Sequence, residues 1–459
     1  MIEKNEVLRL ATALSLRPDT VEKDYVLGWF LYGIYHHGKI SSWVFKGGTS
    51  LKKCFFETYR FSEDLDFTVT DPSQLTQEFL QSAFDEITKF LYDDEVGIEF
   101  FPDRFNFKII PKDNGQVSAQ AKIHYNGPLR RTQGVASIKL DLTTDEILVL
   151  SPVRKSVHHP YTDKPDDGIH VNCYAFEEVV AEKIRALSER ARPRDLYDVV
   201  HFFRNRNLIQ EPKLVYKVLQ KKCDYKAIEV PTFQHIEAHE KIDELETQWE
   251  NMLAHQLAHL PPMQAFWDDL PLFFEWLTNQ LNVSPAISNY ARVGETLFQP
   301  GRVTSAFTVN KILHNIQFAS ANRLCVYVQY NNKNRTIEPL SFRTSSAGNR
   351  LFYGYEREAG HVKAYTLSKI QSVDITEQPY TERYPVEISS TGIISMPPIR
   401  RALQTSQHSR SIGELKYRYQ CSHCGKIFSR IKQNNKLRPH KTKTGWSCTG
   451  RYGVYLGYR

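Results

Sequence analysis

Two short stretches between residues 45 and 67 carry side chains that could do chemistry. The first reads Lys46-Gly47-Gly48-Thr49-Ser50. Paired glycines after a short apolar run allow backbone N–H groups to approach an anion closely. In the second stretch, Asp64 and Asp66 are separated by one apolar residue, and residues i and i+2 of a strand point to the same face. Adjacent carboxylates repel each other unless a cation lies between them, and Mg2+ is the usual choice beside nucleotide phosphates.

Each stretch alone has an ordinary explanation, because Gly-Gly is often only a turn and Asp-x-Asp is often a solvated loop. Their order and their apolar flanks favour chemistry instead. A phosphate-binding loop followed by a metal-binding carboxylate pair is the equipment that nucleotidyl transfer requires.

The fuller pattern, from Lys46 to Leu51 and then Arg60-Phe61-Ser62-Glu63-Asp64-Leu65-Asp66-Phe67, resembles the AbiEii-type nucleotidyltransferase toxins of the superfamily that includes DNA polymerase beta. The resemblance implies an α+β fold with a small mixed sheet and helices. It implies that Gly47, Gly48 and Ser50 hold the β,γ-phosphates of an NTP with support from Thr49. It also implies that Asp64 and Asp66 bind Mg2+.

A third carboxylate on a neighbouring strand completes the metal site in that superfamily, and Asp141 is the residue that matches it. Asp141 points away from its apolar neighbours Leu140 and Leu142, which is also true of any solvent-facing strand residue. Asp145 and Glu146, in the turn beyond, are weaker candidates.

A helical run follows from Phe176, and Lys183 and Arg190 project from nearly the same side of it, where they could face a triphosphate. By resemblance to a later AbiEii motif, Lys183 contacts the nucleotide, and Asp195 and Asp198 of the following Arg-Asp-x-x-Asp support the site, so that both are candidate nucleotide-binding residues. The two aspartates could instead be structural partners of Arg190, Arg194 or Arg204.

The positioning elements can also be predicted from the sequence. Two helices are expected over about 2–37, another after Asp71, and strands near 98–100, 105–110, 119–125 and 135–142. We predict a transferase core over 1–160, a helical subdomain over 161–285 that completes the active site, a β-domain over 300–385 and a basic zinc-binding module over 411–459. Composition is that of a globular protein, and the lack of a long apolar run or signal peptide predicts a cytoplasmic location.

The five strand-like runs between Arg323 and Val373 resemble a WYL domain, a small SH3-like barrel often associated with nucleic acids or nucleotides. Its defining tripeptide is degraded to Phe352-Tyr353-Gly354. Arg343, Arg350 and Lys363 are candidate ligand contacts there, against the alternative that they are ordinary surface charges.

The segment 411–459 has eleven Lys and Arg residues against a single acid, Glu414. Cys421 and Cys424 form a Cys-x-x-Cys pair, and two thiolates at that spacing bind one tetrahedral ion. His440 and Cys448 would supply the remaining ligands of a structural Zn2+, unless the cysteines are unrelated thiols. Interleaved basic and aromatic residues, among them Tyr419, Trp446 and Tyr452, suit a phosphate backbone and exposed bases.

These features favour an Mg2+-dependent toxin that moves a nucleoside monophosphate from an NTP to a hydroxyl. The resemblance favours tRNA 3′ ends as acceptor, with protein hydroxyls as an alternative. It implies a toxin–antitoxin or phage-defence system with a separate antitoxin, and no membrane partner. A different class of function, a nucleic-acid-sensing regulator with an inactive transferase scaffold, is the second hypothesis.

Overall fold

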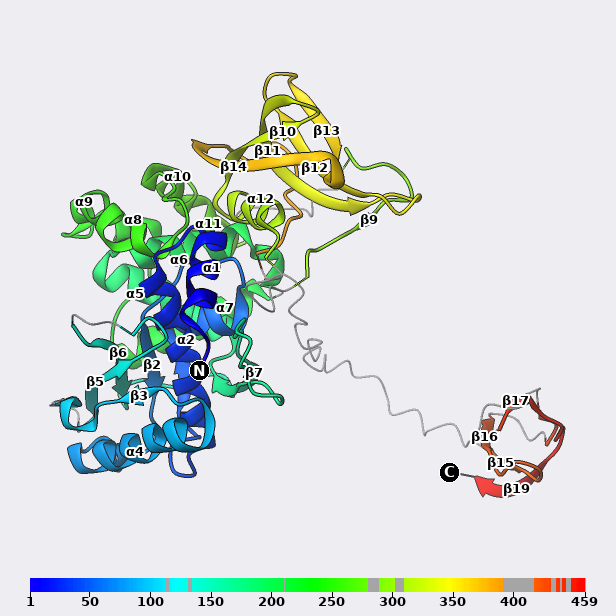
Figure 1. Ribbon diagram of the computed structural model, residues 1–459, viewed down its shortest axis with the longest axis horizontal. Helices are drawn as coiled ribbons and strands as arrows, with labels where there is room; N and C mark the ends of the chain where they lie inside the picture. Colours follow the sequence, from blue (N-terminus) through cyan, green and yellow to red (C-terminus); the bar gives the residue numbers. More distant parts are fainter. Residues whose placement is uncertain are drawn as a thin grey trace. The chain divides into compact units, whose positions relative to one another are not determined.

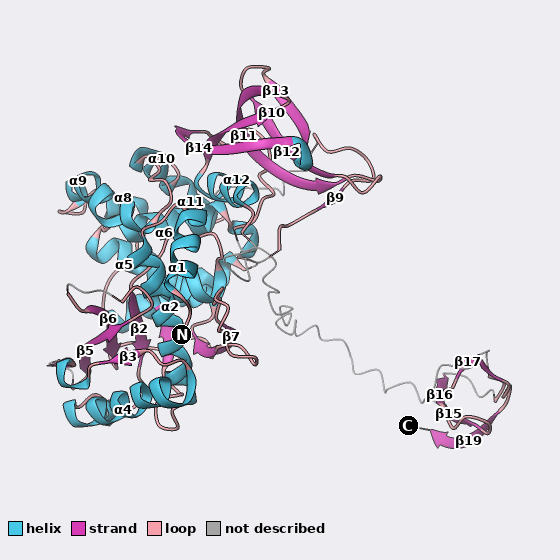
Figure 2. Ribbon diagram, in the orientation of Figure 1, coloured by secondary structure: helices cyan, strands magenta, loops and turns pink. Residues whose placement is uncertain are grey.

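The computed structural model describes residues 1–112, 115–130, 134–209, 211–279, 289–301, 309–390, 417–430, 435–437, 440–442 and 447–458. The chain forms two compact units, Met1–Ile394 and Ser395–Arg459. Figures 1 and 2 show helices and sheets in the first unit and short strands in the second. The predicted α+β class is confirmed. Among the described helices, none combines the length and hydrophobicity that a membrane span requires.

A mixed sheet forms the base of the first unit. Its strands are β1 (Val44–Lys46), β2 (Asp64–Thr68), β3 (Glu99–Phe100), β4 (Asn106–Pro111), β5 (Val117–Asn126), β6 (Ala136–Thr143), β7 (Val153–Ser156) and β8 (His170–Cys173). They lie in the order β3-β5-β6-β2-β1-β8-β7, with β4 beside β5. β2 runs parallel to β6 and antiparallel to β1, so the sheet is mixed as predicted.

The two faces of this sheet differ because side chains alternate along each strand. On one face, Phe67 contacts Trp43, which in turn meets Phe84 of α4 (Gln77–Phe90). Phe84 also contacts Phe30 of the largely buried α2 (Pro18–His36). The opposite face carries the row Lys46, Asp66 and Asp141. In Figure 1 the sheet lies between α4 and the helices α5 to α11.

The remaining helices of this part are α1 (Lys4–Leu14), α3 (Gly47–Ser50), α5 (Phe176–Arg190), α6 (Pro193–Arg204), α7 (Pro212–Lys226), α8 (Phe233–Glu237), α9 (Ile242–Leu253), α10 (Met263–Trp267) and α11 (Leu270–Leu277). Two predicted helix starts were wrong. The glycine pair predicts that a helix starts just after it, at residue 49 or 50, but this helix begins at Gly47. The helix expected after Asp71 begins at Gln77, because the Thr76 hydroxyl caps it by accepting the Phe79 N–H.

A second sheet follows, with strands β9 (Thr296–Leu297), β10 (Leu324–Tyr330), β11 (Lys333–Thr344), β12 (Arg350–Glu356), β13 (His361–Thr366) and β14 (Ile370–Pro379). Five of these strands were predicted. The Asn331-Asn332 pair after the first of them is a sequence signal for a turn, and both residues have positive φ angles (52° and 57°). Positive φ at both positions is what a tight hairpin between β10 and β11 requires. The sequence prediction missed α12 (Lys311–Asn322), which packs against β10, β11 and β14.

Buried polar contacts join α12 to α6. The Tyr197 hydroxyl donates to Asn322 Oδ1 (3.0 Å), and Arg204 Nη1 donates to the Asn322 carbonyl (3.0 Å). Arg323 Nη2 in turn donates to the Arg204 carbonyl (3.1 Å). The β-domain therefore packs directly on a helix of the transferase half.

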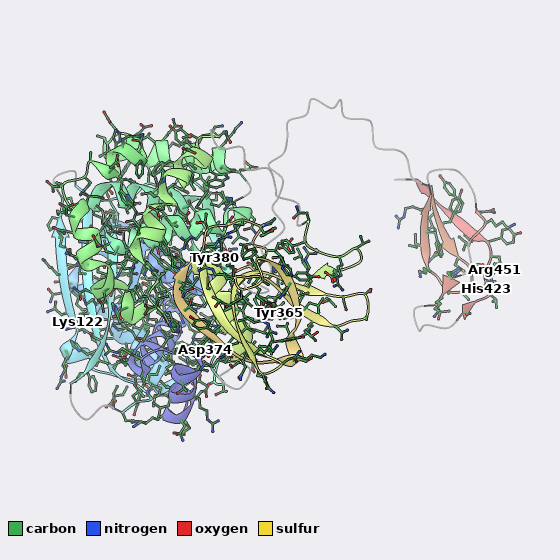
Figure 3. The ribbon with its side chains drawn as sticks, turned by 90° about the horizontal axis from the view of Figure 1, so that it is seen from above. Lys122, Tyr365, Asp374, Tyr380, His423 and Arg451 are labelled. Atoms are coloured by element: carbon green, nitrogen blue, oxygen red, sulfur yellow. The ribbon has the colours of Figure 1, made fainter. Side chains whose placement is uncertain are left out.

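The second unit contains β15 (Tyr417–Cys421), β16 (Ile427–Arg430), β17 (His440–Lys441), β18 (Ser447–Cys448) and β19 (Gly453–Tyr458). β15 is the central strand between β16 and β19, and β17 pairs with β18. Figure 3 shows the side chains of this small unit, with His423 and Arg451 labelled. Trp446 and the residues from 411 to 416 lie outside the described residues.

We expect Asn322→Ala to destabilise the first unit by about 1–3 kcal/mol, because it leaves the buried Tyr197 hydroxyl without its acceptor. Urea unfolding followed by intrinsic fluorescence measures the change. Asn334→Ala, on the exposed part of β11, is the matched control and should stay within about 0.5 kcal/mol of the wild type. Equal effects of the two substitutions would contradict the importance of the contact.

Candidate active site

Three carboxylates share the polar face of the amino-terminal sheet. Asp66 of β2 is directly paired with Asp141 of the parallel strand β6, so the two side chains point the same way. Asp64 lies two residues earlier on β2 and shares that face. All three residues are half-buried. Gln120 Nε2 donates to Asp141 Oδ1 (3.1 Å) from the adjacent strand β5. The structure thus brings together the three carboxylates that the sequence singled out.

The carboxylates disturb one another electrostatically. Burial first, and then the charge of Asp141, raise the pKa of Asp66 to about 6, although Lys46 and Lys183 act in the opposite direction. Burial also raises the pKa of Asp64, with Asp141 adding to the effect and Lys139 opposing it. A cation supplied from outside would relieve this repulsion. Three carboxylates on one face supply the hard oxygen donors that suit a divalent ion such as Mg2+.

The glycine loop lies against this site. Gly47 has a φ of 76°, and a Cβ added there would lie 2.0 Å from Asp66 Oδ2. Only glycine therefore fits between the loop and the carboxylate. The Thr49 hydroxyl donates to the Asp64 carbonyl (2.5 Å) and the Ser50 hydroxyl donates to the Gly47 carbonyl (2.8 Å).

These bonds correct one expectation. Thr49 and Ser50 were predicted to contact phosphate, but they are 1% and 0% exposed. Their hydroxyls donate hydrogen bonds to backbone carbonyls, so both residues stabilise the conformation of the glycine loop. Gly47 and Gly48, in the first turn of α3, stay the candidates for phosphate contact, since first-turn N–H groups have no acceptor within the helix.

Lys183 of α5 is held between two carboxylates of α6. Its Nζ lies 3.3 Å from Asp195 Oδ1 and 2.8 Å from Asp198 Oδ2. Arg190 also contacts Asp195, with Nε 2.6 Å from Oδ2. Burial alone would raise the pKa of Asp195, but Lys183 and Arg190 outweigh it and hold that pKa below its ordinary value.

A direct nucleotide contact by Asp195 or Asp198 was expected and is not supported by the structure. Both residues are 0% exposed, and both carboxylates are already paired with cations. A carboxylate would also repel a triphosphate. The alternative interpretation, that these aspartates are structural partners of nearby arginines, holds for Asp195, which pairs with Arg190. Arg204 pairs with Asp269 instead.

The sequence prediction missed two residues that support Asp198. Arg60 is 2% exposed, and its guanidinium binds both carboxylate oxygens of Asp198 at 2.7 Å. The Tyr59 hydroxyl also donates to Asp198. Together with Lys183, Arg60 holds the pKa of Asp198 well below its ordinary value despite burial. Their position just before the Asp-x-Asp stretch was the only available signal.

Lys46 was also missed, although it immediately precedes the glycines. It is directly paired with Asp66 across β1 and β2, and its Nζ lies 3.0 Å from Glu182 Oε1. Glu182 is shared with the fully buried Lys222 (3.4 Å). This network ties the entrance of the glycine loop to α5 and α7.

Comparison with protein families gives a match over residues 29–279 to the family described as "Nucleotidyl transferase AbiEii toxin, Type IV TA system". The match spans more than half of the chain and includes the glycine loop, the three carboxylates and Lys183. The chain belongs to the AbiEii family. It is therefore a nucleotidyltransferase of a toxin family, as the resemblance predicted.

Two solved structures are similar to this chain. The nucleotidyltransferase toxin MenT4 of Mycobacterium tuberculosis H37Rv has 20% identity and a TM-score of 0.42, over 62% of this chain and 91% of MenT4. The proteasome accessory factor PafBC of Arthrobacter aurescens has 10% identity and a TM-score of 0.15, over 81% of this chain and 73% of PafBC. No curated protein matches this chain.

Beyond these residues of the AbiEii site, Asp145 and Glu146 are engaged in ion pairs. Asp145 lies 2.7 Å from Lys112 and 2.8 Å from Lys226, and Glu146 lies 2.6 Å from Arg185. Because these ion pairs occupy both carboxylates, Asp145 and Glu146, which were already the weaker candidates, are not part of the group formed by Asp64, Asp66 and Asp141.

The basic candidates of the β-domain do not converge on one site. Arg343 is 7% exposed and lies 2.6 Å from Glu387, so its prediction as a ligand contact is not supported. Lys363 lies 3.0 Å from Glu356, and the exposed Arg350 stacks over Phe298. Arg350 is paired with Thr344, whereas Lys363 is paired with Gly354, farther along β12.

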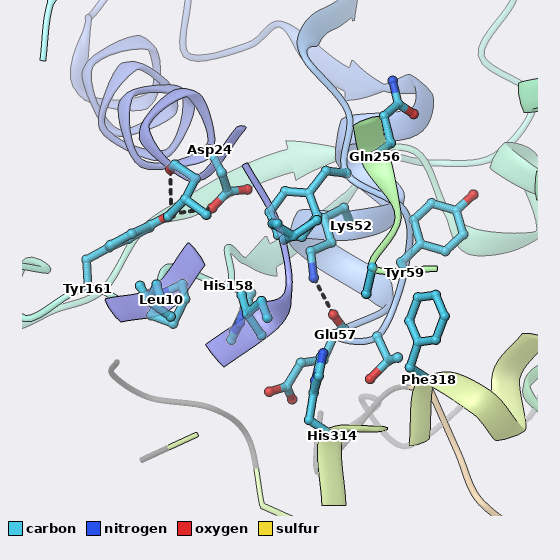
Figure 4. Close-up of a pocket in the computed structure, with 17 residues that line it drawn as sticks. Leu10, Asp24, Lys52, Glu57, Tyr59, His158, Tyr161, Gln256, His314 and Phe318 are labelled. Carbon is cyan, nitrogen blue, oxygen red and sulfur yellow. Dashed lines mark hydrogen bonds between the residues drawn. The ribbon is translucent and has the colours of Figure 1, made fainter. Parts of the chain in front are cut away.

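A separate pocket lies between α1, the segment after α3, and α12 (Figure 4). Lys52, Tyr59, His314 and Phe318 are among its lining residues. None of the described residues that line it is Asp64, Asp66, Asp141 or Lys183. Tyr59 nevertheless links this pocket to Asp198 and hence to the lysine of the active site.

The predicted metal ligands of the second unit come together. Cys421, Cys424, His440 and Cys448 each place one donor atom within 4.8 Å of the others. The two Sγ atoms of Cys421 and Cys448 are 3.8 Å apart, and Cys424 Sγ lies 3.3 Å from His440 Nε2. Direct pairing of His440 with Cys448 across β17 and β18 places these two side chains on one face.

We expect Gly47→Ala to reduce nucleotidyl transfer about 100-fold or more, because the added methyl group would displace the Asp66 carboxylate. The rate of pyrophosphate release from NTP, with Mg2+ and total tRNA present, measures the effect. Gly38→Ala is the control, since a Cβ there would meet nothing within 4 Å. Retention of wild-type activity by Gly47→Ala would refute the close approach.

Proposed function

We propose that this AbiEii-family protein transfers a nucleoside monophosphate from an NTP to an RNA hydroxyl, with the 3′ end of tRNA as acceptor, and that Mg2+ is required. The proposal rests on one observation. Asp66 of β2 is directly paired with Asp141 of β6, and the Asp66 carboxylate lies so close to Gly47 that only glycine fits there. The toxin would act in the cytoplasm, in a toxin–antitoxin or phage-defence system, and would be restrained by a separate antitoxin, as the type IV family description suggests.

In this proposal Asp64, Asp66 and Asp141 hold the metal, which when bound polarises the phosphates and the attacking hydroxyl and offsets their negative charge. Asp141 would also accept the proton of the acceptor hydroxyl. Its half-buried position and its bond from Gln120 would fix the orientation of that carboxylate.

The NTP would be bound by the backbone of Gly47 and Gly48 and by Lys183. Lys183 lowers the pKa of Asp66, so its charge is felt at the metal site. There it would offset the charge that develops on the leaving pyrophosphate. Arg190, whose side chain is 46% exposed, is a second candidate for the phosphates. Asp195 and Asp198 would act as positioning residues for Lys183.

We expect label from an α-labelled NTP to appear on tRNA with the wild type and to fall at least about 1,000-fold with Asp66→Asn, because the substitution removes a charged metal ligand. Each of the four NTPs is tested in turn with Mg2+ and total tRNA. Asp103→Asn, an exposed acid on the surface, is the matched control and should leave transfer unchanged.

The same experiment separates the alternatives. Label on protein rather than RNA would keep the chemistry and replace the acceptor with a protein hydroxyl. Label that persists in Asp66→Asn would overturn the assigned site. Absence of label in every wild-type reaction would favour the second hypothesis, a regulator with an inactive scaffold.

We further propose that the cysteine cluster holds a structural Zn2+. Three thiolates and one imidazole are suitable zinc donors, and Zn–S bonds of about 2.3 Å separate tetrahedral thiolates by about 3.8 Å. The Cys421–Cys448 separation of 3.8 Å agrees with this value. The buried core of the unit is small (Tyr419, Cys421, Leu437 and Cys448), so a metal would supply much of its folding free energy.

We expect purified wild-type protein to contain about one zinc per chain, and a Cys424→Ser/Cys448→Ser variant to contain almost none, because two of four ligands are removed. Inductively coupled plasma mass spectrometry gives the metal content. Cys325→Ala, a buried thiol of β10 outside the cluster, is the control. Undiminished zinc in the double variant would exclude this site.

A further inference from the structure

The three-stranded sheet of the second unit has two unlike faces. On one face, Tyr419 and Cys421 of β15 are buried against Leu437 and Cys448. On the other face, Ile427, Gln420 and Val454 lie in one row across β16, β15 and β19. The first face covers the metal-ligand cluster, and the second face is open.

This open face exposes large apolar side chains. Tyr452 is 60% exposed, Val454 59%, Leu456 46% and Ile427 45%. A Cβ on Gly453 would meet Tyr419 and Leu437 of the buried face, so its neighbours Tyr452 and Val454 lie on the open side of the edge strand β19, and Leu456 follows at a register shift of that strand. An apolar patch of this kind on so small a unit indicates a binding surface.

The charge of the unit indicates what it binds. The segment 411–459 has eleven basic residues and one acid, and Lys426 and Lys441 are exposed on the described part of it. Arg418 lies on the same strand face as Gln420, and Arg451, labelled in Figure 3, immediately precedes Tyr452. Cationic side chains on the same small unit as an apolar and aromatic surface are complementary to a polyanion that offers flat, apolar groups.

We propose that this sheet face binds single-stranded RNA, with bases stacked on Tyr452 and packed against Val454 while the surrounding lysines and arginines meet the phosphates. Single strands fit better than duplexes because the faces of paired bases are covered by their neighbours. The proposal deepens the proposed function by assigning capture of the acceptor to the second unit, and it rests on that function only for the choice of RNA.

The test uses the full chain with Asp66→Asn, so that binding is measured without turnover. Fluorescence anisotropy of a fluorescein-labelled single-stranded RNA 20-mer gives Kd. We expect Tyr452→Ala to raise Kd at least about 10-fold, the loss of one stacked base. Tyr452→Phe keeps the ring and should stay within about 2-fold. Tyr327→Ala, a 46% exposed tyrosine of β10, is the matched control and should leave Kd unchanged.

The salt dependence of the binding constant distinguishes the contribution of base stacking from that of phosphate contacts. For single strands, each lost phosphate contact changes the slope of log K against log salt by about 0.7. Lys426→Ala/Lys441→Ala should therefore reduce the slope by about 1.4, whereas Tyr452→Ala should leave it unchanged. Val454→Glu, on the same open face but outside the aromatic ring of Tyr452, is a second variant that should also weaken binding.

Wild-type affinity in both Tyr452→Ala and Val454→Glu, with zinc content intact, would overturn the proposal. So would equal affinity for duplex RNA, or self-association abolished by Tyr452→Ala, which would assign the face to a second copy of the chain. Because binding is measured in a protein that cannot transfer, loss of RNA binding and loss of transferase activity are distinguishable. A KM for RNA that rises in Tyr452→Ala with kcat unchanged would support the role in capture.

Discussion

The position of Lys183 depends on two carboxylates that have no access to solvent. Asp195 and Asp198 are each 0% exposed, and removing such charges from water is costly unless each is paired. Asp195 is shared by Lys183 and Arg190, and Asp198 by Lys183 and Arg60. Lys183 is the cation common to both, so α5, α6 and the segment before β2 are held in one arrangement by a single set of charges.

That arrangement extends well beyond the family match. The helix α6 carries Asp198 at its middle and Arg204 at its end, and Arg204 is held by α12 through Asn322 and Arg323. On the other side of Asp198, the Thr58 N–H donates to the Ser390 carbonyl (2.8 Å), next to Tyr59 and Arg60. The β-domain therefore contacts both α6, which carries Asp195 and Asp198, and the segment that carries Tyr59 and Arg60. It is a structural part of the transferase, although the AbiEii match ends at residue 279.

Local patterns predicted the parts of the site that strand geometry controls. The two-residue period of β2 was enough to align Asp64 with Asp66, resemblance to the superfamily added Asp141 on the neighbouring strand, and metal chemistry was enough to group Cys421 with its three partners. Burial of Asp195 was not predictable, because an Arg-Asp-x-x-Asp pattern is equally typical of an exposed helix. Arg60 is nearly 140 residues from Asp198 in sequence, so their pairing is a property of the tertiary fold. The helix α12 was missed because its buried positions include the polar Asn315, Gln317 and Asn322, which hide its apolar period.

The aspartates of this site fall into two electrostatic classes, and the charge of Lys183 acts on both of them. Burial and the neighbouring carboxylate raise the pKa of Asp66 to about 6, whereas Arg60 and Lys183 hold that of Asp198 far below its ordinary value. A carboxylate with a lowered pKa already has its cations within the protein. A carboxylate with a raised pKa beside a second carboxylate destabilises the fold when both groups are ionised. Unfavourable charge arrangements of this kind are typical of functional sites. Asp198 is therefore part of the framework, whereas the charge of Asp66 is the one that the metal ion of the proposed function would offset.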